Sequence, residues 1–280
     1  ELERLGHEHA EKSITTLVAS GIVERAAGGS DIVRLGRDAS AVVAPRSAIA
    51  RQRAPAAVRA AVGRGDPINA VHIAATHGTG DLVRDTVVRF GTAAIDAGGG
   101  RLVLDAIDAL GDPSLGGIAG RAAQALGLWE RAIIEYERAA EVEVRHGDAW
   151  RHGLIEHFRG DTVAAARAYR RGIDAGVGDE PAERARLLGY SGSIAWLAGD
   201  LDLARDRATA SLELATAAGD DGALAVAYTL AAMVAAGDGD RMGNDWHYVR
   251  ALQHAERAGD LLQIARIRSN RGSKLMEEGE

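Results

Sequence analysis

The chain lacks cysteine altogether and contains few aromatic residues. None of its 280 residues is cysteine, which excludes a disulfide framework and thiolate zinc sites and is typical of a reducing compartment. Aromatic residues make up only 4% of the chain, whereas hydrophobic residues make up 46%. The core must therefore consist of alanine, leucine, valine and isoleucine, and such alanine richness favours closely packed helices over a β-sandwich.

The chain also lacks a long hydrophobic run and a positive net charge. No apolar segment approaches the roughly 20 residues of a transmembrane helix, and no signal peptide is recognisable. The net charge is −7, which is unfavourable for binding the phosphates of nucleic acids. We therefore expect a cytoplasmic protein without membrane or direct nucleic-acid contacts. Because the sequence starts at Glu1 and stops at "MEEGE", we interpret it as a piece of a longer protein.

The sequence divides into three segments by its pattern of apolar, glycine and basic residues. Apolar pairs at 22–23 and 32–33 flank the Gly28-Gly29 turn and predict a β-hairpin. A hairpin that follows a predicted helix within residues 1–20 is typical of the end of a winged-helix unit, so we assign residues 1–44 to a winged-helix-like segment. Residues 45–113 are expected to form a basic helical connector and degenerate helix hairpins, and residues 114–280 to form helical repeats.

The repeat is defined by pairs of glycines that lie seven residues apart. These pairs are Gly120/Gly127, Gly153/Gly160, Gly192/Gly199 and Gly272/Gly279. An alanine stands five residues after the second glycine, at Ala132, Ala165 and Ala204. An aromatic residue stands four positions further on at Tyr136 and Tyr169, and Ala208 replaces it in the third unit.

Each position of this pattern has a physical role in a pair of antiparallel helices. The first glycine lets the two helices approach closely, and the second ends the first helix in a left-handed conformation. The acidic residues Asp161 and Asp200 can then cap the second helix. A fourth unit is expected to turn at Gly237, with Leu230 in place of the first glycine and a longer loop.

This pattern resembles the tetratricopeptide repeat. The resemblance implies an all-α, superhelical array of antiparallel helix pairs over residues 114–280. The order of winged-helix end, basic connector and long repeats resembles the middle of large multidomain bacterial transcription regulators, the maltose-operon-activator and LuxR-type signal-transduction ATPases. In that family a nucleotide-binding module precedes this region, and a DNA-binding helix-turn-helix often follows it.

Signatures of catalysis and of cofactor binding are missing from the chain. No Walker A motif occurs, so we expect no cofactor in this fragment, and ATP only in an upstream module. His152 and His157 lie five residues apart, which turns them about 140° away from a shared helix face, and the loop 238–249 has Val249 where a calcium loop needs glutamate. We therefore expect no metal site, and because no catalytic constellation is present, no enzyme.

The resemblance also implies where a ligand would bind. In tetratricopeptide arrays the first helix of each pair lines the concave groove, and the matching positions here are Arg121, Gln124, Trp150, Leu154, His157, Arg186, Ser193, Trp196, Arg266 and Ser269. Trp150 and Trp196 have a second interpretation, since they can equally pack between units. Trp129 and Trp246 fall on second helices, where we expect core positions.

These observations predict a sensor and protein-interaction region of a multidomain bacterial transcriptional regulator. Its partners would be a protein or small-molecule inducer bound in the groove and other domains of the same polypeptide. The alternative is a stand-alone helical-repeat adaptor that binds a peptide or protein.

Overall fold

A computed structural model describes residues 23–25, 33–35, 40–178 and 180–278, with side chains described for 48–178 and 180–272. The chain divides into two compact units, residues 1–97 and 98–280, and each is described by itself. Nearly all of the described residues are helical, which confirms the predicted helical character. The predicted three-segment division of the chain stays a prediction.

The first unit contains a short strand pair followed by helices. Its elements are β1 (Val23–Arg25), β2 (Val33–Leu35), α2 (Ser40–Gly63), α3 (Pro67–His77) and α4 (Gly80–Ala94). β1 and β2 pair antiparallel, with Val23 opposite Leu35. The predicted turn between them and the predicted helix within 1–20 lie outside the described residues, so the winged-helix assignment stays a prediction.

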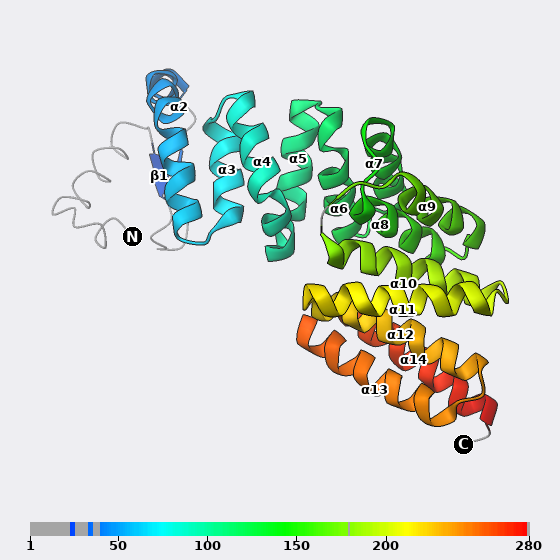
Figure 1. Ribbon diagram of the computed structural model, residues 1–280. Helices are drawn as coiled ribbons and strands as arrows, with labels where there is room; N and C mark the ends of the chain where they lie inside the picture. Colours follow the sequence, from blue (N-terminus) through cyan, green and yellow to red (C-terminus); the bar gives the residue numbers. More distant parts are fainter. Residues whose placement is uncertain (1–22, 26–32, 36–39, 179, 279–280) are drawn as a thin grey trace. The chain divides into compact units, whose positions relative to one another are not determined.

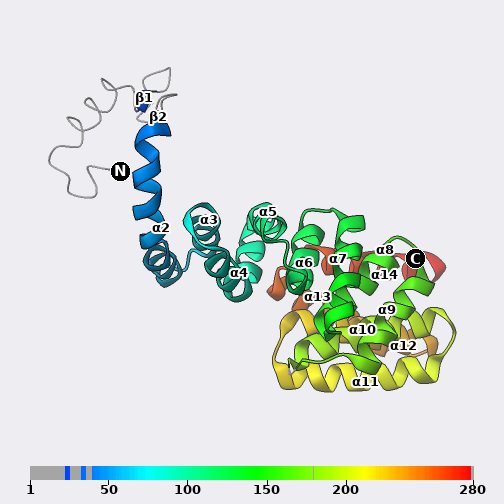
Figure 2. The ribbon, with the colours of Figure 1, turned by 90° about the horizontal axis from the view of Figure 1, so that it is seen from above.

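Helices α3 and α4 of the first unit start at side-chain caps. The Asp66 carboxylate accepts a hydrogen bond from the Asn69 amide at 3.0 Å and begins α3, and the Thr79 hydroxyl accepts one from the Leu82 amide at 3.3 Å and begins α4. Such caps satisfy amide groups that have no partner within the helix. Figure 2 shows α3 and α4 nearly end-on as an adjacent pair. A short π-helical segment, η2 (Ile95–Gly99), follows α4.

The second unit is a succession of helices joined by short turns (Figure 1). Its elements are α5 (Gly100–Leu110), η3 (Pro113–Leu115), α6 (Gly116–Ala125), α7 (Trp129–Val142), α8 (His146–Phe158), α9 (Thr162–Ala175), α10 (Pro181–Leu197), α11 (Leu201–Ala218), α12 (Asp221–Gly237), α13 (Arg241–Ala258) and α14 (Leu261–Glu278). Its closest helix associations are within the pairs α6–α7, α8–α9, α10–α11 and α12–α13. We call α6, α8, α10, α12 and α14 the first helices.

Each early pair is locked by a glycine on the first helix and a tyrosine on the second. A Cβ atom on Gly120 would lie 2.6 Å from the ring of Tyr136, and one on Gly153 would overlap the ring of Tyr169. Both tyrosines are buried. The absence of a side chain at the glycine therefore makes room for the ring, and the close approach of the two helices at the first glycine is as predicted.

The turns within the pairs are built as the sequence predicts. Gly127, Gly160 and Gly199 all adopt left-handed conformations, with φ of 71°, 83° and 81°. The Asp161 carboxylate accepts a hydrogen bond from the Ala164 amide at 2.8 Å, and that of Asp200 accepts one from the Leu203 amide at 3.1 Å. The repeat alanines Ala132, Ala165 and Ala204 are fully buried. These predictions of turn, cap and packing position are confirmed.

The turn of the fourth pair lies two residues later than the sequence predicts. The left-handed glycine is Gly239, with φ of 76°, whereas Gly237 is the last residue of α12. In this register Ala232 takes the place of the first glycine and buried Tyr248 takes the aromatic position. Asp240 caps α13 by accepting from the Gly243 amide at 2.9 Å. The prediction of a turn at Gly237 is therefore wrong. Two glycines lie close together here, and the sequence pattern places the turn at the first of them instead of at Gly239.

The third pair replaces the tyrosine by a residue from its neighbour. Ala208 stands where Tyr136 and Tyr169 stand in the first two pairs, and a Cβ atom on Gly192 would instead overlap Leu230 of α12. Leu230 is fully buried. The side chain that fills the space beside the glycine thus comes from the next pair, which ties the third pair to the fourth.

We predict opposite stability changes for Gly153→Ala and Gly272→Ala. A methyl group at 153 would displace the buried Tyr169 ring and should lower the free energy of unfolding by about 2 kcal/mol. Gly272 lies within α14, and a Cβ atom there would meet nothing within 4 Å, so alanine should raise the free energy of unfolding by about 0.5–1 kcal/mol through helix propensity. Urea denaturation measures both, and equal effects would contradict the glycine–tyrosine lock.

Candidate functional site

Six of the ten predicted groove residues gather around Tyr190 of α10. They are Trp150, Leu154 and His157 on α8, Arg186 and Ser193 on α10, and Arg266 on α14. The Trp150 ring stacks on Tyr190 with 5.5 Å between ring centroids, and the Arg266 guanidinium lies 5.1 Å from the Tyr190 centroid. Leu154 and Tyr190 belong to one buried cluster. First helices far apart in sequence therefore meet at this point.

Trp150 is held between the second and third pairs by a charged network. Its indole N–H donates to the Glu183 carboxylate of α10, and Arg151 donates to the two oxygens of the same carboxylate at 3.0 and 3.3 Å. The Arg151 guanidinium also lies 4.2 Å from the Trp150 ring centroid. Trp150 therefore packs between units, the second of the two interpretations that its sequence position allowed.

Glu183 stays ionised within this network. Burial by itself raises the pKa of its carboxyl, but the Arg151 charge and the hydrogen bonds from Arg151 and Trp150 outweigh it, so the pKa lies below its ordinary value of 4.5. Both side chains of the ion pair are largely buried. The pair joins α8 to α10 and keeps one carboxylate charge inside the protein.

Arg186, Ser193 and Arg266 also have partners within the protein. Arg186 donates to Asp220 at 2.5 Å, and the same Asp220 caps α12. Arg266 donates to the Ser193 hydroxyl at 3.1 Å across 73 residues of sequence. The Ser193 hydroxyl donates in turn to the Gly189 carbonyl at 3.2 Å. These predicted groove residues hold first helices together.

His157 is a neutral, half-buried member of the same region. Burial and the nearby Arg266 charge lower the pKa of its imidazole to about 4. Its Nδ1 atom and the hydroxyl of Tyr169 are buried without a hydrogen-bond partner among the described residues. Burial raises the pKa of the Tyr169 hydroxyl, and the positive charge of Arg266 opposes this rise.

The other four predicted groove residues lie away from Tyr190. Gln124 accepts a hydrogen bond from the Tyr136 hydroxyl at 2.9 Å, and Arg121 is half-buried on the same helix, α6. The indole nitrogen of Trp196 is buried and lies 3.3 Å from where a Gly237 Cβ would be, so Trp196 too packs between units. Ser269 is exposed on α14.

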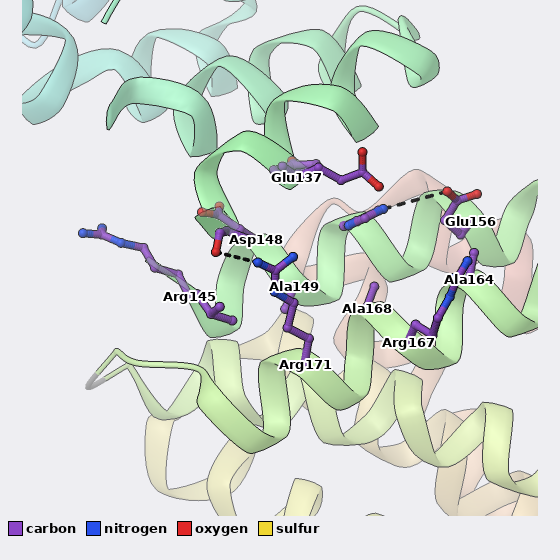
Figure 3. Close-up of a pocket in the computed structure, with 13 residues that line it drawn as sticks. Glu137, Arg145, Asp148, Ala149, Glu156, Ala164, Arg167, Ala168 and Arg171 are labelled. Carbon is purple, nitrogen blue, oxygen red and sulfur yellow. Dashed lines mark hydrogen bonds and ion pairs between the residues drawn. The ribbon is translucent and has the colours of Figure 1, made fainter. Parts of the chain in front are cut away.

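A cavity that sequence reasoning missed lies between α7, α8 and α9 (Figure 3). Its volume is about 240 Å³. Four alanines leave the space, namely Ala140, Ala149, Ala164 and Ala168. Charged side chains from all three helices and from the turn before α8 surround it, namely Glu137, Asp148, Glu156, Arg145, Arg167 and Arg171. The cavity is therefore lined by small apolar side chains and by side chains of both charges.

His152 lies at the centre of the charges of this cavity. Burial lowers the pKa of its imidazole, while Glu137 and Glu156 oppose this effect and Arg171 and Arg167 add to it. The His152 Nε2 atom lies 3.8 Å from the Glu156 carboxylate. The i, i+4 spacing of Arg167 and Arg171, and of His152 and Glu156, is a signal for shared helix faces. That spacing does not predict that these faces of α8 and α9 border the same cavity.

The tryptophans predicted to lie in the core are at the surface. Trp129 is 39% exposed and Trp246 is 54% exposed, so both predictions are wrong. Trp129 begins α7 directly after a turn, and its ring stacks on that of Phe158 from the end of α8 at 6.5 Å between centroids. Phe158 is itself 40% exposed. An aromatic pair thus bridges the turns of two successive helix pairs at the surface.

Comparison with protein-family models and with curated proteins gave no match. The resemblance to tetratricopeptide regulators therefore remains an inference from the residues. Among the residues that the structure describes, no three or more acidic, histidine or cysteine side chains are grouped to hold a metal ion. None of the described helices is long and apolar enough to cross a membrane.

We predict that Arg151→Met destabilises the protein by about 3 kcal/mol, because it leaves the largely buried Glu183 carboxylate without its closest charged partner, and Arg186 lies further away at 3.8 Å. The double variant Arg151→Met/Glu183→Gln should recover part of this loss, since it removes the buried charge. Urea denaturation of the two variants measures the difference. A double variant that is less stable than the single one would contradict this assignment.

We also predict that the contribution of Glu183 depends on pH. Because its pKa is lower in the folded protein than the ordinary 4.5, the stabilisation is fully present above about pH 4.5 and is lost as pH falls through the folded value. The difference in free energy of unfolding between the wild type and Glu183→Gln should therefore shrink below pH 4.5. A difference that stays constant down to pH 3 or grows on acidification would contradict the prediction.

Proposed function

We propose that this chain is the sensor and protein-interaction region of a multidomain bacterial transcriptional regulator. In this proposal the helix pairs wind into a superhelix whose concave face is lined by the first helices, and β1 and β2 belong to the end of a winged-helix unit. The region is cytoplasmic and not enzymatic, and ATP binds only to a separate module of the polypeptide. The repeat pattern and the order of the segments support this assignment.

The observation that carries the interaction role is a row of exposed apolar side chains at the turns within helix pairs. We call it the turn strip, and it consists of Leu126, Leu128, Trp129, Phe158, Val163, Leu197, Leu201 and Met242. The stacked Trp129–Phe158 pair links the first two turns, and an Arg205–Asp238 hydrogen bond of 2.8 Å links the last two. Exposed apolar patches of this kind mark interaction sites.

The charges beside the turn strip favour a basic partner. Every one of its turns carries exposed acidic residues, including Glu130, Asp161, Asp200 and Asp240. Arg205 at the third turn pairs with Asp202 and Asp238, and Arg159 at the second turn pairs with Glu156. A partner surface with apolar and basic side chains therefore complements the turn strip. We propose that this partner is the nucleotide-binding module of the same polypeptide.

We predict that Trp129→Ala and Phe158→Ala weaken binding of the purified nucleotide-binding module by at least tenfold, because exposed aromatic side chains dominate the energetics of interfaces. The melting temperature should change by less than about 3 °C, because both side chains are half-exposed. Val142→Ala is the matched control, since Val142 is exposed at the other end of α7. Isothermal titration calorimetry measures the affinities.

The surrounding reading frame supplies the first test of this proposal. It should encode a P-loop module before this region and a helix-turn-helix beside it. A frame that encodes neither would refute the regulator assignment and favour the stand-alone adaptor. Unchanged affinity of the module for Trp129→Ala and Phe158→Ala would show that the turn strip is not the interface.

A further inference from the structure

We propose that the cavity between α7, α8 and α9 is a binding site for a small zwitterion of the size of a free amino acid. Its charged groups would place the ligand carboxylate against Arg167 and Arg171 of α9 and the ligand ammonium against Glu137 of α7 and Glu156 of α8. The proposal deepens the sensor role by naming a ligand class, and it rests on that role only for the consequence of binding. Binding itself is measured without any regulatory partner.

The first argument is that two opposite charges at this cavity lack partners. Among the described residues Glu137 and Arg167 have neither a hydrogen bond nor an ion pair, and both are exposed at the mouth of the cavity, where a ligand can reach them. Figure 3 shows Glu137 and Glu156 on one side of the cavity and Arg167 and Arg171 on the other. These four groups, to which Asp148 and Arg145 add one further charge of each sign, complement a molecule with both charges.

The second argument is that Arg171 is anchored and that both Arg171 and Glu156 keep free hydrogen-bonding capacity. Arg171 donates through one nitrogen to the Ala140 carbonyl at 2.6 Å, which anchors its guanidinium to α7, and its other N–H groups can donate to a ligand. Glu156 has only long contacts of 3.8 Å to His152 and Arg159. No arginine that the structure describes lies at short range from the carboxylate of Glu137 or of Glu156, so each carboxylate can accept a hydrogen bond from an ammonium group.

The third argument is the state of His152 between these charges. Burial keeps its imidazole neutral because it lowers the pKa, and a neutral imidazole offers one donor and one acceptor nitrogen. It can therefore donate to a carboxylate or accept from an ammonium without adding charge to the site. The three carboxylates and three guanidiniums that line the cavity then balance one another, which suits a neutral, dipolar ligand.

The size of the cavity restricts the ligand further. Pockets for drug-sized molecules have volumes of about 300–1,000 Å³, and this cavity measures about 240 Å³. Alanines at 140, 149, 164 and 168 supply a limited apolar surface for one short side chain. This volume fits a single amino acid with a short side chain.

Calorimetric titration of the full 280-residue chain with the free standard amino acids tests the proposal. At least one should bind with a dissociation constant below about 1 mM. Its amide, which lacks the carboxylate, and its N-acetyl form, which lacks the ammonium, should each bind at least tenfold more weakly. A dipeptide with the same side chain should also bind more weakly, because its two charges are further apart.

Variants locate the ligand. Arg167→Gln and Glu137→Gln should each weaken binding about tenfold, and Ala164→Leu should abolish it by filling the cavity. Arg170→Gln and Glu141→Gln are matched controls, because both are exposed on the same helices and do not line the cavity. They should leave binding unchanged, and circular dichroism should show all five variants to be folded.

Several results would overturn the proposal. One is the absence of binding by every free amino acid at about 10 mM, ten times the expected dissociation constant. Another is equal binding of the amide or the N-acetyl form, and a third is equal weakening by the control variants. None of these results bears on the turn strip, and loss of module binding leaves the titration unaffected, so the two proposals fail separately.

Discussion

The second unit depends on the close approach of paired helices where a glycine faces a bulky side chain. At Gly153 a single methyl group would occupy the space of the Tyr169 ring, and at Gly192 the same space is filled by Leu230 from the following pair. Because the chain has few aromatic residues, each buried ring fills a place that small neighbours leave open. These contacts between a glycine and its facing side chain determine how each pair packs. The polar network around Tyr190 then connects neighbouring pairs.

Most of this packing could be predicted from the sequence, because it depends on residues close together in the chain. The seven-residue glycine spacing, the caps at Asp161 and Asp200 and the buried alanines all lie within one helix pair and recur. The fourth pair was misregistered for the same reason. Gly237 and Gly239 are both plausible turn residues by composition, and only the left-handed φ of Gly239 decides between them.

Contacts between helix pairs could not be predicted in the same way. Arg266 reaches Ser193 over 73 residues, and this contact depends on how successive pairs stack. The surface positions of Trp129 and Trp246 follow from the same stacking, since large apolar residues on second helices suggest a core when each pair is considered alone. The cavity between α7, α8 and α9 likewise exists only once two neighbouring pairs are placed together. The predicted groove residues around Tyr190 hold the pairs together, whereas the side chains of the turn strip are exposed.

A double-mutant cycle in the third pair tests the central claim most directly. If one side chain must fill the space at Gly192, then Ala208→Tyr and Leu230→Ala each disturb the packing, whereas the double variant restores a tyrosine in the arrangement of the first two pairs. The free energies of unfolding should then be non-additive, with the double variant more stable than the sum predicts by about 1–3 kcal/mol. Additivity within about 0.5 kcal/mol would contradict the claim that glycine and its facing side chain form the unit of packing.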